Sequence, residues 1–321
     1  MRTYAYVVVS VCFAALGPIS ALAQSPKFEN GYRSAQDRIH PIFGTRGMVS
    51  SQEARATGVG IDILQQGGNA VDAAVAVGFA LAVTLPRAGN IGGGGFMLLH
   101  LAGNGKTVAI DYRETAPKSA TRTMFLKADG AVDRARVRYS HRSVGVPGTV
   151  AGLTMALRRY GTMPLEKVMA PAIRFAAEGI LVSRDMAHQL KRRAKRLKKM
   201  SETKRIFFGK DGKPLNAGDR LLQRDLAESL RSIAKGGATA FYKGDVAGRI
   251  VAEMKANKGL ITAQDLADYR AVMREPVHGR YRGYDVYSMP PPSSGGIHLV
   301  QILNILEGYD LAAFGPNSAA S

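Results

Sequence analysis

The spacing of hydrophobic positions changes along the chain, and these changes mark the expected elements. Residues 70–83 are almost wholly apolar and rich in small side chains, a pattern typical of a helix buried on every side. Asn69 precedes this run and Asp72 follows three residues later, so both can accept backbone N–H groups at the helix start. Pro86 ends the helix, which is too short to span a bilayer.

Two apolar runs, residues 96–101 and 107–112, predict neighbouring antiparallel strands. Asn104-Gly105 lies between them, and both residue types tolerate the positive φ of a tight turn. Neither run alternates cleanly between apolar and polar residues, so we expect both faces of the strands to be covered.

Turn residues and helical spacing predict the other elements. Ser51 is the expected cap of a helix with Glu53 in its first turn, and Thr262 with Asp265 resembles a capping box. A strand is expected at residues 284–289. Helices are expected at residues 149–160, from after Pro164 to 179, at 218–233 and 245–258, from the Thr262 cap to 269, and at 297–306. The last of these follows Ser293–Gly296, which either bind an anion through free N–H groups or are scaffold.

The N-terminus predicts export. Arg2, the apolar segment 5–16 and Ala21-Leu22-Ala23 form a secretory signal over residues 1–23, although an uncleaved anchor is the alternative. A mature chain beginning at Gln24 is therefore expected to be periplasmic or secreted. Residues 24–46 are polar and irregular, a leader into a domain over residues 47–321.

Charge adds one feature to this picture. The 321 residues carry a formal net charge of +19, and residues 191–205 hold nine lysines and arginines against Glu202. Helical spacing of the apolar residues there indicates a helix. No aromatic residue is available to stack on bases and the chain carries an export signal, so we expect no nucleic-acid partner. A weak contact with an anionic surface through Lys191–Arg205 stays open beside a solvated basic face.

The chemistry-bearing region is the strand pair. Four glycines, Gly92–Gly95, precede the first strand, which usually marks close approach of a ligand or another backbone. They lack the pattern of a phosphate loop or a dinucleotide fingerprint. Arg113 leaves the second strand with a planar fork suited to a carboxylate, unless it simply pairs with Glu114 or Asp111.

Several motifs in order carry a family resemblance. These are GGGGFM at 92–97, DYRETAP at 111–117, LITAQDL at 260–266 and PPPSSGG at 290–296. From about Gly47 onward the chain resembles the gamma-glutamyltransferase (glutathione hydrolase) family of N-terminal nucleophile hydrolases. The resemblance implies an α+β fold, an αββα sandwich that is incomplete in this chain, which would be part of the large subunit. It also implies that Arg113 binds the α-carboxylate of glutathione or another γ-glutamyl donor.

The resemblance places the catalytic group outside this chain. In the family, a precursor cleaves itself before a threonine, which then acts as nucleophile with its own α-amino group as base. We expect no catalytic residue, metal or cofactor in this chain, a missing C-terminal small subunit as partner, and no activity of the chain alone. The six histidines show no metal-ligand spacing. The alternatives are a related cephalosporin acylase or poly-γ-glutamate depolymerase, or a non-catalytic truncated product.

Overall fold

The computed structural model describes residues 43–315, of which Val49 onward form one compact unit. The predicted signal peptide, residues 24–42 of the leader, and residues 316–321 lie outside the described residues. Residues 43–48 contain no helix or strand. Among the helices of residues 43–315, none is both long enough and apolar enough to cross a membrane.

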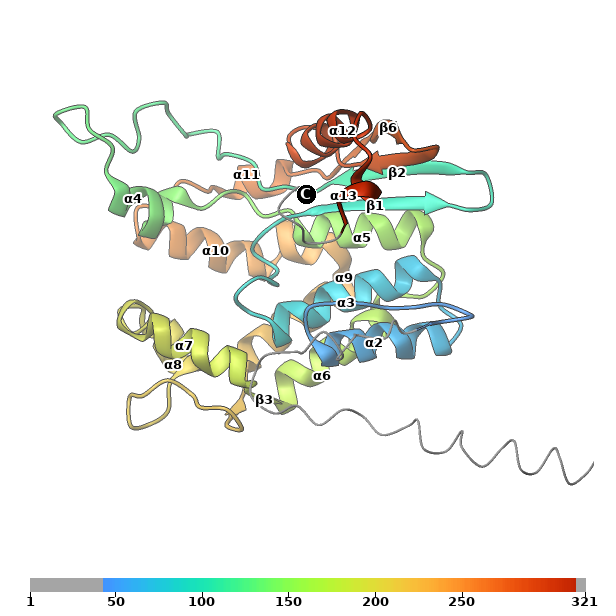
Figure 1. The fold of residues 1–321 in the computed structure, drawn as a ribbon. Helices are drawn as coiled ribbons and strands as arrows, with labels where there is room; N and C mark the ends of the chain where they lie inside the picture. The colour runs from blue at the N-terminus through green and yellow to red at the C-terminus, as the bar shows by residue number, and fades with distance from the viewer. Residues whose placement is uncertain (1–42, 316–321) are drawn as a thin grey trace, which may run out of the picture. The chain divides into compact units, whose positions relative to one another are not determined.

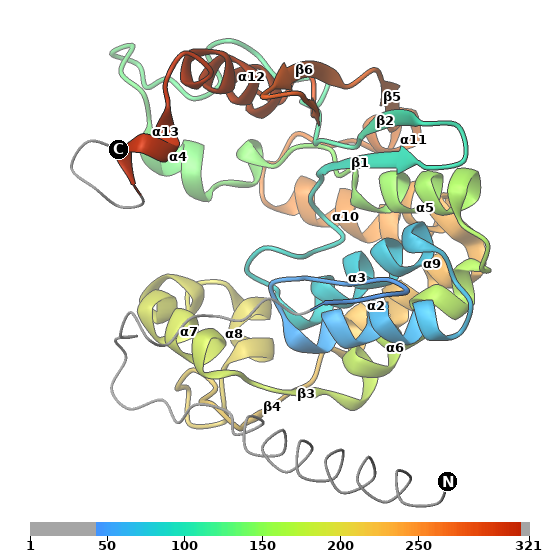
Figure 2. The same cartoon turned by 45° about the vertical axis from the view of Figure 1, so that its right-hand side comes forward.

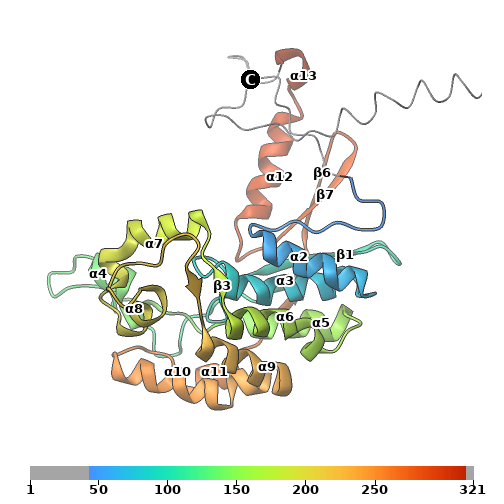
Figure 3. The ribbon, with the colours of Figure 1, turned by 90° about the horizontal axis from the view of Figure 1, so that it is seen from below.

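A stack of helices forms the core of this unit. It contains α2 (Ala54–Gln65), α3 (Ala70–Thr84), α5 (Thr149–Tyr160), α6 (Leu165–Glu178) and α9 (Arg224–Tyr242). Helix α3 packs on α2, α5 and α6, and α6 packs on α9 (Figures 1 and 3). Because α3 is apolar on every side, this central place buries most of its length, as predicted.

The start of α3 is the predicted capping box. The Asn69 side chain accepts from the N–H groups of Val71 and Asp72, and the Asp72 carboxylate accepts from the Asn69 N–H at 2.8 Å. Asp72 also receives hydrogen bonds from Thr162 and Met163, which begin the connection to α6. The cap therefore ties two helices together.

Helix α2 starts differently from the prediction. Glu53, and not Ser51, is the N-cap, and its carboxylate accepts from the Ala56 N–H at 3.1 Å. Ser51 instead donates its hydroxyl to the Glu53 carbonyl at 2.9 Å. A longer acidic side chain has taken the place of the expected short one.

A three-stranded antiparallel sheet covers α5. It consists of β1 (Phe96–Leu101), β2 (Lys106–Asp111) and β5 (Val272–Arg274), in the order β1-β2-β5. The hairpin of β1 and β2 is confirmed, with Gly105 at a φ of 66° in its turn. Strand β5 was not predicted, because its pairing with β2 joins segments far apart in the sequence.

The two hairpin strands differ in burial. Val108–Asp111 of β2 are buried on both faces, as expected. On β1, Met97 and Leu99 pack against the core, whereas Leu98 and His100 are exposed. The expectation that both faces are covered is therefore wrong for β1, whose Leu98 and His100 side chains are exposed on its outer face.

The remaining elements surround this framework. They are α4 (Arg134–Tyr139), η2 (His141–Ser143), β3 (Ile180–Leu181), α7 (Arg184–Leu197), α8 (Ser201–Phe207), β4 (Arg220–Leu221), α10 (Asp245–Ala256), α11 (Ala263–Asp268), β6 (Val277–Tyr281), β7 (Tyr284–Ser288), α12 (Gly295–Leu306) and α13 (Leu311–Phe314). Helix α12 packs on the β6–β7 hairpin and lies on the opposite side of β1 and β2 from α5 (Figures 1 and 2).

Two further predictions need correction. The helix expected from Gly218 begins only at Arg224, because residues 220–221 pair with β3 as a short strand. The basic stretch forms two helices, α7 and α8, rather than one.

Candidate functional site

Arg113 leaves the sheet directly after β2 and Tyr112, and its backbone is fixed from both sides. The buried Asp111 carboxylate accepts from the Arg113 N–H at 3.0 Å, and the Tyr269 hydroxyl donates to the Arg113 carbonyl at 2.8 Å. Asp111 is held in turn by Arg274 of β5, whose Nε donates to it at 2.8 Å. The main chain of Arg113 is therefore anchored by residues from β2, β5 and the end of α11.

Tyr112 forms the floor beneath this position. Its ring packs so closely on α5 that a Cβ at Gly152 would lie 2.1 Å from the Tyr112 Cγ. Gly152 therefore allows α5 to contact a ring at the end of a strand. The hydroxyl donates to the Phe96 carbonyl at 3.2 Å, and burial raises the pKa of Tyr112 to about 12, so it stays neutral.

The glycine run lies against other backbone segments. The Gly93 carbonyl accepts from the N–H groups of Gly148 and Thr149, at 2.7 and 3.0 Å, where α5 begins. A Cβ at Gly94 would lie 2.5 Å from the Tyr112 carbonyl oxygen. Gly94 needs to be glycine because the turn before β1 passes close to the backbone at the end of β2.

The Arg113 guanidinium itself faces solvent. Its side chain is 56% exposed, its Cζ lies 5.8 Å from the centre of the Phe96 ring, and its Nε is 3.3 Å from Glu114 Oε2. Neither Nη atom has a hydrogen-bond partner within residues 43–315. An exposed pair of this kind contributes about 0–1 kcal/mol, so a ligand carboxylate can compete for the fork at small cost.

The groups around Arg113 offer binding rather than chemistry. Burial, and then the charges of Asp111 and Glu114, raise the pKa of Tyr269, which therefore also stays neutral. Within residues 43–315 a hydroxyl is hydrogen-bonded to a histidine at one place, Thr107 with His100, at the opposite end of the hairpin. The arrangement can hold a carboxylate, and it presents no activated nucleophile beside it.

The sequence made Arg113 a candidate ligand for a carboxylate but gave no indication of the residues that hold its backbone. Tyr269 and Arg274 lie 156 and 163 positions away from their partners Arg113 and Asp111. No local pattern distinguishes them. The only available signal was that Tyr269 stands at the end of an expected helix; Arg274 lies on β5, which was not predicted.

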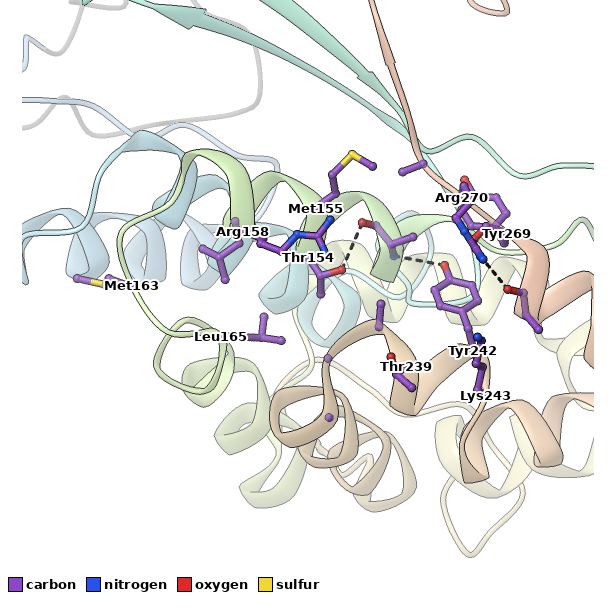
Figure 4. Close-up of a pocket in the computed structure, with 17 residues that line it drawn as sticks. Thr154, Met155, Arg158, Met163, Leu165, Thr239, Tyr242, Lys243, Tyr269 and Arg270 are labelled. Carbon is purple, nitrogen blue, oxygen red and sulfur yellow. Dashed lines mark hydrogen bonds between the residues drawn. The ribbon is translucent and has the colours of Figure 1, made fainter.

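A cavity of about 650 Å³ lies behind this region, between α5, α9 and α11 (Figure 4). Arg113 does not line it, although Tyr269 contributes to both. Tyr242 closes one side, donating to the Pro147 carbonyl at 2.8 Å and accepting from the Ala151 N–H at 3.3 Å. Because both hydrogen bonds of the Tyr242 hydroxyl hold the start of α5, this hydroxyl is not available to bind a ligand in the cavity.

The start of α12 favours scaffold over anion binding. Gly296 is buried there, and a Cβ at this position would lie 2.3 Å from the Met289 carbonyl oxygen. The Ser293 hydroxyl already accepts from the Gly295 N–H at 3.2 Å. The glycines thus let α12 pack against the end of β7.

Comparison with known proteins places this chain among similar sequences. A family model described as Gamma-glutamyltranspeptidase matches residues 56–321. A glutathione hydrolase proenzyme of Escherichia coli (strain K12) is 54% identical over 300 residues, covering 94% of this chain and 52% of the relative. An acylase ACY 1 proenzyme of Pseudomonas sp. (strain SE83) is 41% identical over 281 residues, covering 86% of this chain and 50% of that relative.

A solved structure agrees with these relatives. The crystal structure of Helicobacter pylori gamma-glutamyltranspeptidase superposes with a TM-score of 0.85 at 48% identity, covering 87% of this chain and 80% of that one. The fold is thus a mixed helix-and-sheet fold shared with a known transpeptidase. The chain belongs to the gamma-glutamyltranspeptidase family, as the resemblance predicted. It spans about half the length of the curated relatives that it matches.

Proposed function

We propose that this chain is the donor-binding part of a γ-glutamyltransferase that acts as a glutathione hydrolase, and that Arg113 binds the α-carboxylate of the γ-glutamyl donor. The observation that carries the proposal is the half-exposed guanidinium with both Nη atoms free of partners in residues 43–315, on a backbone fixed by Asp111 and Tyr269. A guanidinium fork carried on an anchored backbone matches a planar carboxylate.

The chemistry of the complete enzyme follows from the family. A threonine outside these 321 residues attacks the γ-carbonyl carbon, its own α-amino group taking the hydroxyl proton. The C–N bond breaks, the proton passes to the leaving amine, and a γ-glutamyl ester remains on the threonine. Water then releases glutamate, or an amino acid or dipeptide takes the acyl group. Arg113 serves this sequence by holding the donor's far end, so that the γ-carbonyl meets the nucleophile.

We further propose that the rest of the family's αββα sandwich packs on surfaces that this chain leaves open. Strand β1 is an edge of the described sheet, and its Leu98 is 41% exposed. Helix α12 exposes Ile302 and Ile305 by 53% and 65%. Large apolar side chains gathered in this way are typical of an interface. The missing partner is the C-terminal small subunit that the resemblance implies.

The test compares variants of Arg113 in the full-length protein, in hydrolysis of glutathione and of a γ-glutamyl anilide. Losing a bidentate charge-assisted pair costs on the order of 2–5 kcal/mol, so Arg113→Ala should lower kcat/KM roughly 30-fold or more. Arg113→Lys should also be poor, because it keeps the charge and loses the fork. Arg122→Ala, an exposed arginine elsewhere, is the matched control. If Arg113→Ala lowers kcat/KM by no more than about twofold, the guanidinium forms only a surface ion pair and does not bind the donor.

A second candidate function is acylase activity on another substrate, favoured by the 41% identity to an acylase proenzyme. The same full-length protein assayed with a β-lactam side-chain amide separates the two. A higher kcat/KM on that amide than on glutathione would assign the protein to the acylases.

The 321-residue chain assayed alone should turn over neither substrate, because the nucleophile is outside it; turnover above buffer would show a catalytic group within it.

Export completes the proposal. Arg2, the apolar segment 5–16 and Ala21-Leu22-Ala23 support cleavage before Gln24 and a periplasmic or secreted protein. N-terminal sequencing of protein from the periplasm or medium should begin at Gln24. A cytoplasmic pool that retains Met1 would contradict this location.

A further inference from the structure

The basic stretch found in the sequence forms a defined surface. Its nine lysines and arginines lie on the second half of α7, the connection 198–200 and α8, and every one of them is exposed. This surface, residues 191–205, is called the α7–α8 face below. It stands apart from Arg113 and has no role in the function proposed above.

Helix α7 is held in one orientation. Met186 and Leu190 are buried in a small separate core with residues of β3 and β4. Lys191, Lys195 and Lys198 are spaced by four and three residues, which places them together on the outward side. The charges are therefore presented on a fixed support rather than on a mobile tail.

Few of these charges are neutralised. Within residues 43–315, Arg205 alone of the nine forms ion pairs, with Glu202 at 2.8 Å and with Asp225. Arg196 lies 5.3 Å from the centre of the Tyr139 ring, and Arg193 donates to Gln189 at 3.2 Å. Eight cations on two short helices repel one another, so the folded protein bears a cost that a polyanionic partner would relieve.

A groove of mixed polarity borders the same face, and Glu53 and Asp185 line it beside the apolar side chains. A cavity of about 690 Å³ lies between α7 and the ends of α2 and α3, with Leu190, Leu197 and Phe207 in its wall. Arg193 and Arg196 also line it. The buried Thr84 hydroxyl, another lining group, has no hydrogen-bond partner in the part of the chain described.

We propose that the α7–α8 face docks on the surface of an anionic phospholipid bilayer. Phosphate headgroups match the outward lysines, and Met200, half-exposed between α7 and α8, can enter the interface. The apolar part of the groove wall lies beside Arg193 and Arg196, a combination that suits the acyl chain and the phosphate of a lipid. Nucleic acid fits less well, because residues 191–205 contain no aromatic side chain on which a base could stack, and the neighbouring Tyr139 ring already contacts Arg196.

The experiment measures binding of the full chain to vesicles by sedimentation at low salt. Vesicles of phosphatidylcholine alone are compared with vesicles in which about a third of the lipid is phosphatidylglycerol. We expect binding to the anionic vesicles only, declining as salt is raised. The triple variant Lys191→Gln/Lys195→Gln/Lys198→Gln should bind roughly 100-fold more weakly, since each basic residue near the surface contributes comparably.

The matched control removes the same charge elsewhere. Arg231→Gln/Lys235→Gln/Lys255→Gln changes three exposed residues of α9 and α10 and should reduce binding far less. Circular dichroism checks that both variants keep the wild-type helix content. Equal binding to both vesicle types, or equal losses for both triple variants, would overturn the proposal. Tighter binding to duplex RNA than to anionic vesicles at equal phosphate concentration would also overturn it and assign the face to nucleic acid.

Discussion

Replacing Asp72 with asparagine should destabilise the protein by about 2–4 kcal/mol. The carboxylate is fully buried and each of its oxygens accepts two hydrogen bonds. Oδ1 accepts from the N–H groups of Thr162 and Met163, at 2.9 and 3.1 Å. Oδ2 accepts from the Asn69 N–H at 2.8 Å and the Thr162 hydroxyl at 2.7 Å.

The magnitude follows from what an amide can replace. The best orientation of asparagine puts its oxygen in the place of Oδ1 and its NH₂ in the place of Oδ2. The Thr162 hydroxyl can turn to accept from that NH₂, but the Asn69 N–H then faces another donor. One buried N–H left without an acceptor costs about 1–3 kcal/mol, and the two remaining N–H bonds lose the added strength of a charged acceptor.

The pH dependence carries a definite sign. Burial alone would raise the pKa of Asp72, but the hydrogen bonds from Thr162, Asn69 and Met163 outweigh it and hold the pKa below its ordinary value. A carboxyl with a depressed folded-state pKa contributes stability above its unfolded pKa of about 3.9, and this contribution is lost as pH falls through the folded value. The difference between the wild type and Asp72→Asn should therefore shrink below about pH 4.

The assay is urea unfolding of the purified protein, followed by circular dichroism at neutral pH and at several acidic values. Asp62→Asn is the control, because Asp62 is exposed on α2 and makes no side-chain hydrogen bond within residues 43–315. The control should change the free energy of unfolding by less than about 0.5 kcal/mol. If Asp72→Asn also changed the free energy of unfolding by less than about 0.5 kcal/mol, the view that this cap joins α3 to the start of α6 would be refuted.

Two further predictions concern the support of Arg113. Tyr269→Phe removes the hydroxyl that donates to the Arg113 carbonyl at 2.8 Å, so KM of the full-length enzyme for its donor should rise several-fold, with about 1 kcal/mol of stability lost; an unchanged KM would show that this bond does not position the fork. Gly152→Ala places a Cβ 2.1 Å from the Tyr112 Cγ, and overpacking of this kind should cost roughly 1–3 kcal/mol in urea unfolding; a neutral result would mean that the ring moves freely.

Local patterns predicted those parts of the fold whose partners lie close in the sequence. The capping boxes of α3 and α11 each join residues three apart, and the hairpin of β1 and β2 closes through a short turn. Strand β5 was missed because it pairs Val272 with Asp111, which lies about half the chain away. Strand β6 was missed because its turn uses Arg282 at a φ of 48°, where asparagine or aspartate is the usual signal.

The candidate site was likewise predictable only where its residues lie close in the sequence. The sequence predicted Arg113 at a strand exit, and the glycines before β1 indicated close backbone approach. It did not show that Asp111 turns away from the guanidinium to bind Arg274 and the Arg113 N–H, which leaves Glu114 as the ion-pair partner. That choice depends on β5 and α11, whose positions only the folded chain defines.

The central claim is that Arg113 binds the donor's α-carboxylate, and a double-mutant cycle between the two tests it most directly. kcat/KM is measured for a γ-glutamyl anilide and for the same anilide with its α-carboxylate converted to a carboxamide, in full-length wild type and in Arg113→Ala. If the groups bind each other, the carboxamide should cost roughly 30-fold in the wild type and no more than about twofold in the variant. Equal losses in both enzymes would contradict the account, because the carboxylate would then be recognised without Arg113.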